Sequence, residues 1–130
     1  MNSSLGTNDP SLFEPAMRAF AQIAIAWSLT DLEQSALLDL RPETRTALLE
    51  NGAMDDLWPE TLERVSYLLG IYHALHVIFP SRQQADEWPR RQNSGALFNG
   101  RSALLFMSSG RLEDLAAVRR HLEGQGISYP

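Results

Sequence analysis

Residues 58–80, WPETLERVSYLLGIYHALHVIFP, decide the fold of this chain. Pro59 suits the first turn of a helix, and Pro80 ends it. Apolar residues follow helical spacing in between. The stripe that we expect to be buried contains Leu62, Val65, Leu69, Tyr72, His76 and Phe79, with Leu68, Ile71, Leu75 and Ile78 on its flanks. After Gly70 apolar side chains surround the helix almost completely, which predicts the central buried helix of the protein.

Three shorter helices are expected before this stretch. The first begins near Pro15 and continues to about residue 29. Thr30, with Glu33 three residues later, forms a capping box for a helix over residues 31–39, which offers Leu32, Ala36 and Leu37 to the core. A third helix covers residues 42–51, from a first-turn proline to a glycine. Residues 1–13 are expected to be a flexible tail.

Three further helices are expected after it. Ser81 caps a helix that ends at Trp88, and residues 90–100 form a loop rich in turn formers. Ser102 caps a helix that Gly110 closes, and the last helix covers residues 112–124, followed by a tail over residues 125–130. No strand pattern is recognisable. The sequence therefore predicts an all-α, compact helical domain of about six to seven helices.

The amino-acid composition indicates the cellular compartment and excludes several kinds of site. The 130 residues contain no cysteine, which excludes disulfides and thiolate metal sites and favours the cytoplasm. The N-terminus lacks the features of a signal peptide, and the longest apolar run is too short to span a bilayer, so no membrane association is expected. The net charge of −5 is uneven: residues 1–60 carry −7 and residues 61–130 carry +2. An acidic N-terminal half disfavours DNA binding by the free protein.

The sequence contains no recognisable catalytic constellation. His73 and His76 have a spacing that can bind a metal, but no further ligands accompany them. His76 is better explained as a hydrogen-bonded core residue, and His121 as a charge at a helix C-terminus. No nucleophile is paired with a base, and no phosphate-binding loop is present. We therefore expect a protein that is not an enzyme and that uses neither a metal nor a cofactor.

The loop after the fifth predicted helix has the composition of a protein-binding surface. Trp88, Phe98 and several arginines lie among turn residues, and Trp and Arg are common interface hot spots. Two explanations stay open for Trp88 and Phe98, which either contact a partner or hold the loop on the central helix. For Arg90 and Arg91 the sequence favours partner contact.

The second and third predicted helices have the outline of a helix-turn-helix. The third helix would present Thr44 and Arg45 to DNA, together with Glu43 and Glu50. Recognition helices usually present more basic and amide side chains than this. A packing or dimerisation unit is therefore the preferred interpretation.

Four motifs in order give the chain a family resemblance. They are TLERVSYLLGIYHALHVIFP (61–80), ADEWPRRQN (85–93), LFNGRSALL (97–105) and AAVRRHLEG (116–124). Together they resemble the toxin-binding domain of the Xre/MbcA/ParS antitoxins. Residues 21–44 resemble the degenerate Xre-like helical module that often precedes this domain. The resemblance implies an Xre-like module over residues 14–56 and a toxin-binding domain over residues 57–124.

The resemblance implies a type II antitoxin without catalytic activity. It would neutralise a cognate RES-domain toxin, which consumes NAD, by covering the toxin's active site, and it would form a homodimer through the Xre-like module. The toxin-binding residues that it implies, completed by Arg90 from the composition of the loop, are Trp88, Arg90, Asn93, Phe98, Gly100, Arg101, Leu104, Arg119, Ser128, Tyr129 and Pro130. A DNA-binding transcriptional autoregulator and an orphan adaptor protein of the same fold remain the alternatives.

Overall fold

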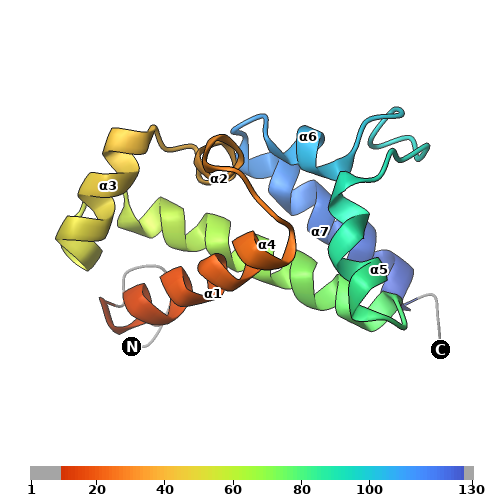
Figure 1. Ribbon diagram of the computed structural model, residues 1–130, viewed down its shortest axis with the longest axis horizontal. Coiled ribbons are helices and arrows are strands. Elements are labelled where there is room, and N and C mark those ends of the chain that lie inside the picture. Colours follow the sequence, from red (N-terminus) through yellow and green to blue (C-terminus); the bar gives the residue numbers. More distant parts are fainter. Residues whose placement is uncertain (1–9, 128–130) are drawn as a thin grey trace.

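The computed structural model describes residues 10–127, which form an all-α fold (Figure 1). Seven α-helices and no strands are present in this part of the chain. The helices are α1 (Phe13–Ala26), α2 (Asp31–Leu38), α3 (Pro42–Asn51), α4 (Trp58–Ile78), α5 (Arg82–Glu87), α6 (Ala103–Met107) and α7 (Leu112–Ile127). Short 3-10 turns are η2 (Pro10–Leu12), η3 (Gly52–Met54) and η4 (Trp88–Arg90). The predicted fold class is confirmed.

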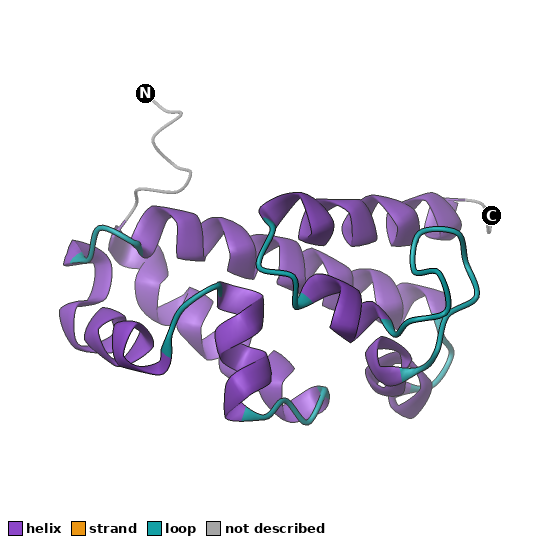
Figure 2. Ribbon diagram, turned by 90° about the horizontal axis from the view of Figure 1, so that it is seen from above, coloured by secondary structure: helices purple, strands orange, loops and turns teal. Residues whose placement is uncertain are grey.

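Helix α4 is the axis of the molecule. It runs from one end to the other, with α3 near its start and α5 at its end (Figures 1 and 2). Helices α7 and α1 pack along it most extensively. One hydrophobic core joins side chains from both halves of the chain, including Trp27, Leu38, Leu68 and Leu115. The two segments that the resemblance separates thus share a single core.

The buried face of α4 differs from the predicted stripe. Leu68, Ile71 and Leu75, expected on the flanks, are completely buried. Tyr72 is only half-buried, and Val77 is exposed. Helices α1 and α7 both pack against α4, so the buried residues of α4 are those that face these two helices. The prediction that this helix would be buried nearly all round is wrong for its C-terminal half.

Helix α2 begins as predicted but turns a different face to the core. The Oγ1 of Thr30 accepts a hydrogen bond from the backbone N–H of Glu33 at 3.1 Å, and the Glu33 carboxylate accepts one from the N–H of Thr30 at 2.9 Å. This is the expected capping box. Leu37 and Leu38 are buried, whereas Leu32 is 79% exposed, so its assignment to the core is wrong.

The C-terminal end of α7 also differs from the prediction. The helix continues to Ile127, so neither Gly124 nor Gly126 ends it, and the predicted tail from residue 125 is correspondingly shorter. Ser128, Tyr129 and Pro130 lie outside the described residues. None of the helices in residues 10–127 combines the length and the apolarity that crossing a membrane requires.

Candidate functional site

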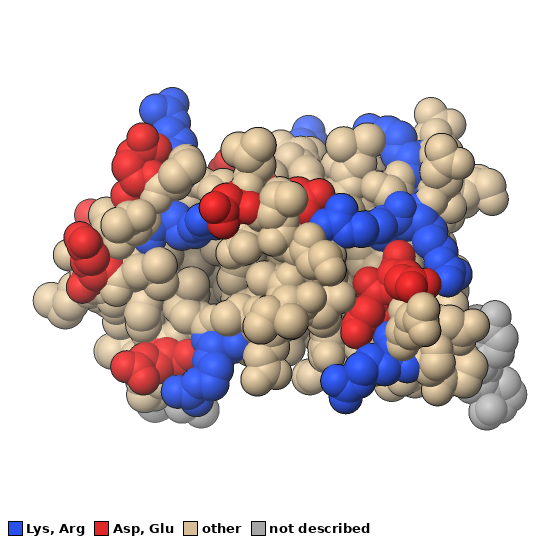
Figure 3. All heavy atoms as spheres, viewed as in Figure 1, with Lys and Arg blue, Asp and Glu red and all other residues tan. Residues whose placement is uncertain are grey.

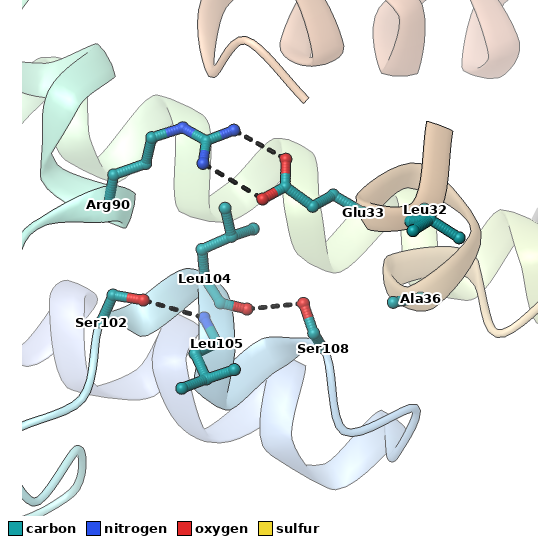
Figure 4. A pocket seen from close by; sticks show the side chains of 8 residues that line it. All are labelled: Leu32, Glu33, Ala36, Arg90, Ser102, Leu104, Leu105 and Ser108. Carbon is teal, nitrogen blue, oxygen red and sulfur yellow. Dashed lines mark hydrogen bonds and ion pairs between the residues drawn. The ribbon is translucent and has the colours of Figure 1, made fainter. Parts of the chain in front are cut away.

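A groove between α2 and α6 lies beside the predicted interface loop (Figure 4). Its volume is about 440 Å³. Leu32 and Ala36 line it from α2, and Leu104 and Leu105 line it from α6. Leu32 is 79% exposed and Leu105 is 59% exposed. Two large aliphatic side chains therefore reach solvent on the facing walls of one groove.

Arg90 closes one end of the groove. Its Nη1 and Nη2 donate to the two carboxylate oxygens of Glu33 at 3.1 and 2.7 Å, as Figure 4 shows. Its Nε donates to the carbonyl oxygen of Trp27 at 3.0 Å, and Nη2 also donates to that of Ser28 at 2.7 Å. One guanidinium thus fixes η4 against the end of α1 and the start of α2. Arg90 is mainly a structural clamp, a role that the sequence did not indicate.

The same contact alters the acidity of Glu33. The hydrogen bond from Arg90 stabilises the carboxylate and holds the pKa of Glu33 below its usual value, while partial burial opposes this shift. The backbone N–H of Thr30 adds a further stabilising hydrogen bond. The Glu33 carboxylate therefore remains ionised at neutral pH.

The hydroxyl groups beside the groove are occupied within the protein. The Oγ of Ser102 accepts a hydrogen bond from the backbone N–H of Leu105 at 3.1 Å, and the Oγ of Ser108 donates to the carbonyl oxygen of Leu104 at 2.7 Å. These interactions cap and close α6. The groove consequently presents aliphatic surface with one charged pair at its end, which suits an apolar protein side chain better than a polar metabolite.

Asn93 and Gly100 shape the loop between η4 and α6. The Oδ1 of Asn93 accepts a hydrogen bond from the N–H of Gly95 at 3.0 Å, and its backbone pairs with Arg101 and Gly100. Gly100 adopts a φ of +84°, which favours glycine. An isolated bridge between Gln92 and Ser102 closes the loop. Both predicted site residues thus act on the shape of the loop.

Phe98 is completely buried, which decides the alternative that the sequence left open for it. Its ring makes edge-on contacts with Trp88, Phe106 and His121, with centroids 5.7, 5.6 and 5.5 Å away. Direct partner contact by Phe98 is therefore excluded in this conformation, because the ring holds the loop against α7. Trp88 is half-buried in the same cluster. His121 lies inside α7 and contacts Phe98, so the prediction of a helix-terminal charge is wrong.

The remaining predicted residues lie in different places. Leu104 is nearly buried and forms the floor of the groove. Arg101 is exposed, with its guanidinium 5.8 Å from the centre of the Phe106 ring. Arg119 lies in a second groove, between α4 and α7, which shares no lining residue with the first. There its Nε donates to Glu123 at 2.9 Å. The structure brings Arg90 and Leu104 together but not Arg119.

Comparison with known proteins identifies a relative along nearly the whole chain. A protein from Sinorhizobium fredii, "Uncharacterized protein y4oB", is 34% identical over 125 residues, which cover 96% of this chain and 95% of the relative. The chain belongs to the y4oB family. No protein-family model matches the sequence, and no solved structure matches it.

The predicted DNA-contact residues of this y4oB-family chain are turned toward the protein. The Arg45 side chain is 19% exposed, and its Nη1 donates to the carbonyl oxygen of Asp31 at 3.4 Å. Thr44 is half-buried. The expectation that Arg45 projects outward from the third helix is therefore wrong.

The charged surface of the y4oB-family chain consists largely of neighbouring opposite charges. Figure 3 shows acidic and basic side chains side by side over one face, with uncharged surface between them. His76 is paired as expected for a satisfied histidine, with its Nε2 3.0 Å from Asp86 Oδ1. Within residues 10–127, no group of three or more histidine, aspartate or glutamate side chains could hold a metal ion.

Sequence reasoning missed Leu32, Leu105 and Glu33 as parts of the site. Helical periodicity placed Leu32 in the core, and Leu105 lies within a short apolar helix whose outward face the sequence does not mark. For Glu33 the sequence predicts only the capping box, which the structure confirms. Its additional bond to Arg90 joins residues 57 positions apart, and no local signal indicates such a contact.

Proposed function

We propose that this chain is a type II antitoxin, which binds a cognate NAD-consuming RES-domain toxin and neutralises it by covering the active site of the toxin. The groove between α2 and α6 is part of the binding surface. The observation that carries the proposal is the pair of exposed leucines, Leu32 and Leu105, on facing walls beside the loop whose motifs resemble the antitoxin family.

Several features support a protein partner. The hydroxyls of the groove are already hydrogen-bonded, and the exposed side chains of its walls are aliphatic. Interfaces use such apolar centres with a polar rim. Arg101 is exposed on the neighbouring loop and supplies a charged donor at the rim. The inward position of Arg45 and the acidic N-terminal half favour this proposal over DNA-binding autoregulation.

Co-expression with the product of the adjacent gene tests the proposal. We expect the two proteins to co-purify, and cellular NAD to be preserved only when this chain is present. Absence of both a complex and an effect on NAD would refute the antitoxin function, and binding to the chain's own promoter would then favour the regulator.

Matched variants test the position of the site. Leu32→Asp and Leu105→Asp place a charge in the groove without disturbing the core, and each should weaken toxin binding at least 30-fold, equivalent to about 2 kcal/mol for a hot-spot residue. Ile25→Asp is the control because Ile25 is also 79% exposed but lies on α1, outside this groove. Equal losses in all three variants would show that the groove is not the contact surface.

A further inference from the structure

The turn after α3 presents an apolar side chain beside a carboxylate. Residues 52–57, GAMDDL, form η3 and its connection to α4, and we call them the η3 knob. Met54 is 88% exposed. Asp56 is exposed as well, and its carboxylate has no hydrogen bond or ion pair with any of residues 10–127. Methionine is enriched in protein interfaces, so the knob has the composition of a contact with another protein.

Asp55 fixes the shape of the η3 knob from within. Its Oδ1 accepts a hydrogen bond from the backbone N–H of Leu57 at 2.9 Å. Its Oδ2 accepts a second, longer bond of 3.4 Å from Nδ2 of Asn51. The turn that carries Met54 and Asp56 is therefore held in place before a partner binds. A contact through this knob loses little conformational entropy in the backbone.

The groove between α4 and α7 offers the complementary surface. Its volume is about 490 Å³. Ala74 and Val77 line it from α4, and Leu122 lines it from α7. Leu122 is completely buried, whereas Val77 is 77% exposed on the wall. The groove therefore has an apolar interior that accepts an aliphatic side chain, and Arg119 lies in it beside these residues.

Arg119 is held in one orientation and keeps donors to spare. A Cβ at Gly70 would lie 2.7 Å from Arg119 Nε, so the missing side chain of Gly70 gives the arginine room against α4. The Arg119 Nε donates to Glu123 at 2.9 Å, and its guanidinium carbon lies 5.8 Å from the centre of the Tyr67 ring. Neither Nη atom bonds to any of residues 10–127. A fixed guanidinium with two unused Nη groups suits a carboxylate.

The η3 knob and this groove can meet only between two copies of the chain. The knob follows α3 at one end of the molecule, whereas residues 119–123 lie on α7 toward the other end (Figure 1). The charges of the two halves favour such a contact, because residues 1–60 carry −7 and residues 61–130 carry +2. A two-fold contact between N-terminal halves would instead bring two acidic surfaces together.

We propose that the chain associates with itself head to tail. Met54 of one copy inserts into the α4/α7 groove of the next copy, and the Asp56 carboxylate accepts hydrogen bonds from the Nη groups of Arg119. Each assembly then keeps one free knob and one free groove at its ends, so it grows beyond a dimer unless a ring closes. This contact differs from the dimer through residues 14–56 that the family resemblance implies, and it does not rest on the proposed function.

Sedimentation velocity of the free, full-length chain tests the contact. The weight-average sedimentation coefficient of the wild type should rise with concentration beyond the value of a dimer. Asp56→Arg and Arg119→Glu should each weaken association at least ~30-fold, because like charges then face each other. Glu43→Arg and Arg120→Glu are the matched controls, since they reverse the same charges at exposed positions outside the knob and the groove. Both controls should associate like the wild type.

Mixing the two charge-reversal variants distinguishes a direct contact from a loss of folding. The Arg119→Glu chain keeps an intact knob, and the Asp56→Arg chain keeps an intact groove, so an equimolar mixture should recover association that neither variant shows alone. Val77→Asp places a charge on the exposed groove wall and should also prevent association. A monomeric wild type, association that either charge reversal leaves unchanged, or a mixture that does not recover would each overturn the proposal. Because no toxin is added, the result is independent of whether the chain is an antitoxin.

Discussion

Replacement of Arg90 by lysine should destabilise the protein substantially, although it preserves the charge. The guanidinium makes four hydrogen bonds at once, two to Glu33 and one each to the carbonyl oxygens of Trp27 and Ser28. A lysine ammonium is a point charge and cannot reproduce this planar fork. We expect it to keep one or two of these bonds.

The magnitude follows from the lost bonds and their exposure. Hydrogen bonds to charged groups contribute about 1.5–3 kcal/mol when they are buried. The Arg90 and Glu33 side chains are 41% and 26% exposed, so each lost bond is discounted for solvent screening. Arg90→Lys should therefore lower the free energy of unfolding by about 2 kcal/mol, which corresponds to a fall in Tm of about 5–10 °C.

Urea denaturation measures this change, with Arg91→Lys as the matched control. Arg91 is the neighbouring residue, and its Nη2 lies 3.4 Å from Glu87, with both side chains 51% exposed. This control should change stability by less than about 0.5 kcal/mol. A double-mutant cycle with Glu33→Gln should give a coupling energy of about 1 kcal/mol. Equal effects of the two lysine substitutions, or zero coupling, would refute the clamp.

Three further predictions concern stability. Phe98→Ala should lower the free energy of unfolding, measured by urea denaturation, by about 3–5 kcal/mol because the ring is fully buried. An unchanged denaturation midpoint would show that the ring is not part of the core. Gly110→Ala should lower the free energy of unfolding by about 1–3 kcal/mol, because the residue has a φ of +86°. Gly124→Ala is the control and should not destabilise the protein. Gly124 lies within α7, and a Cβ there meets no described heavy atom within 4 Å. Because the pKa of Glu33 is lowered in the folded protein, its bond to Arg90 stabilises the fold fully above pH 4.5. This stabilisation disappears as the pH falls through the folded-state pKa. The difference in Tm between wild type and Glu33→Gln should therefore shrink in acid.

The candidate site could be predicted only in part. The sequence predicts Arg90 and Leu104 as site residues, and both line the groove, but Arg90 is held by Glu33 and Leu104 forms the floor. Phe98 has the residue type of a hot spot, yet it is in the core. Residue type indicates that a side chain can make a strong contact, and it does not indicate whether the contact lies inside the protein or at its surface.

The sequence alone determined where several of the helices begin and end. Thr30 and Glu33 cap α2, Pro42 begins α3 and Gly110 follows α6, because capping, proline geometry and left-handed backbone act over a few residues. These local rules also determined the all-α class.

Tertiary structure decided which faces of the helices are used. The packing of α1 and α7 selected the buried arc of α4, and Arg64 became a buried contact for Asp39 and Gly110 only when those distant segments met. The groove likewise exists because α2 and α6, far apart in the chain, face each other. Such contacts depend on the relative positions of whole helices, and helical periodicity contains no information about those positions.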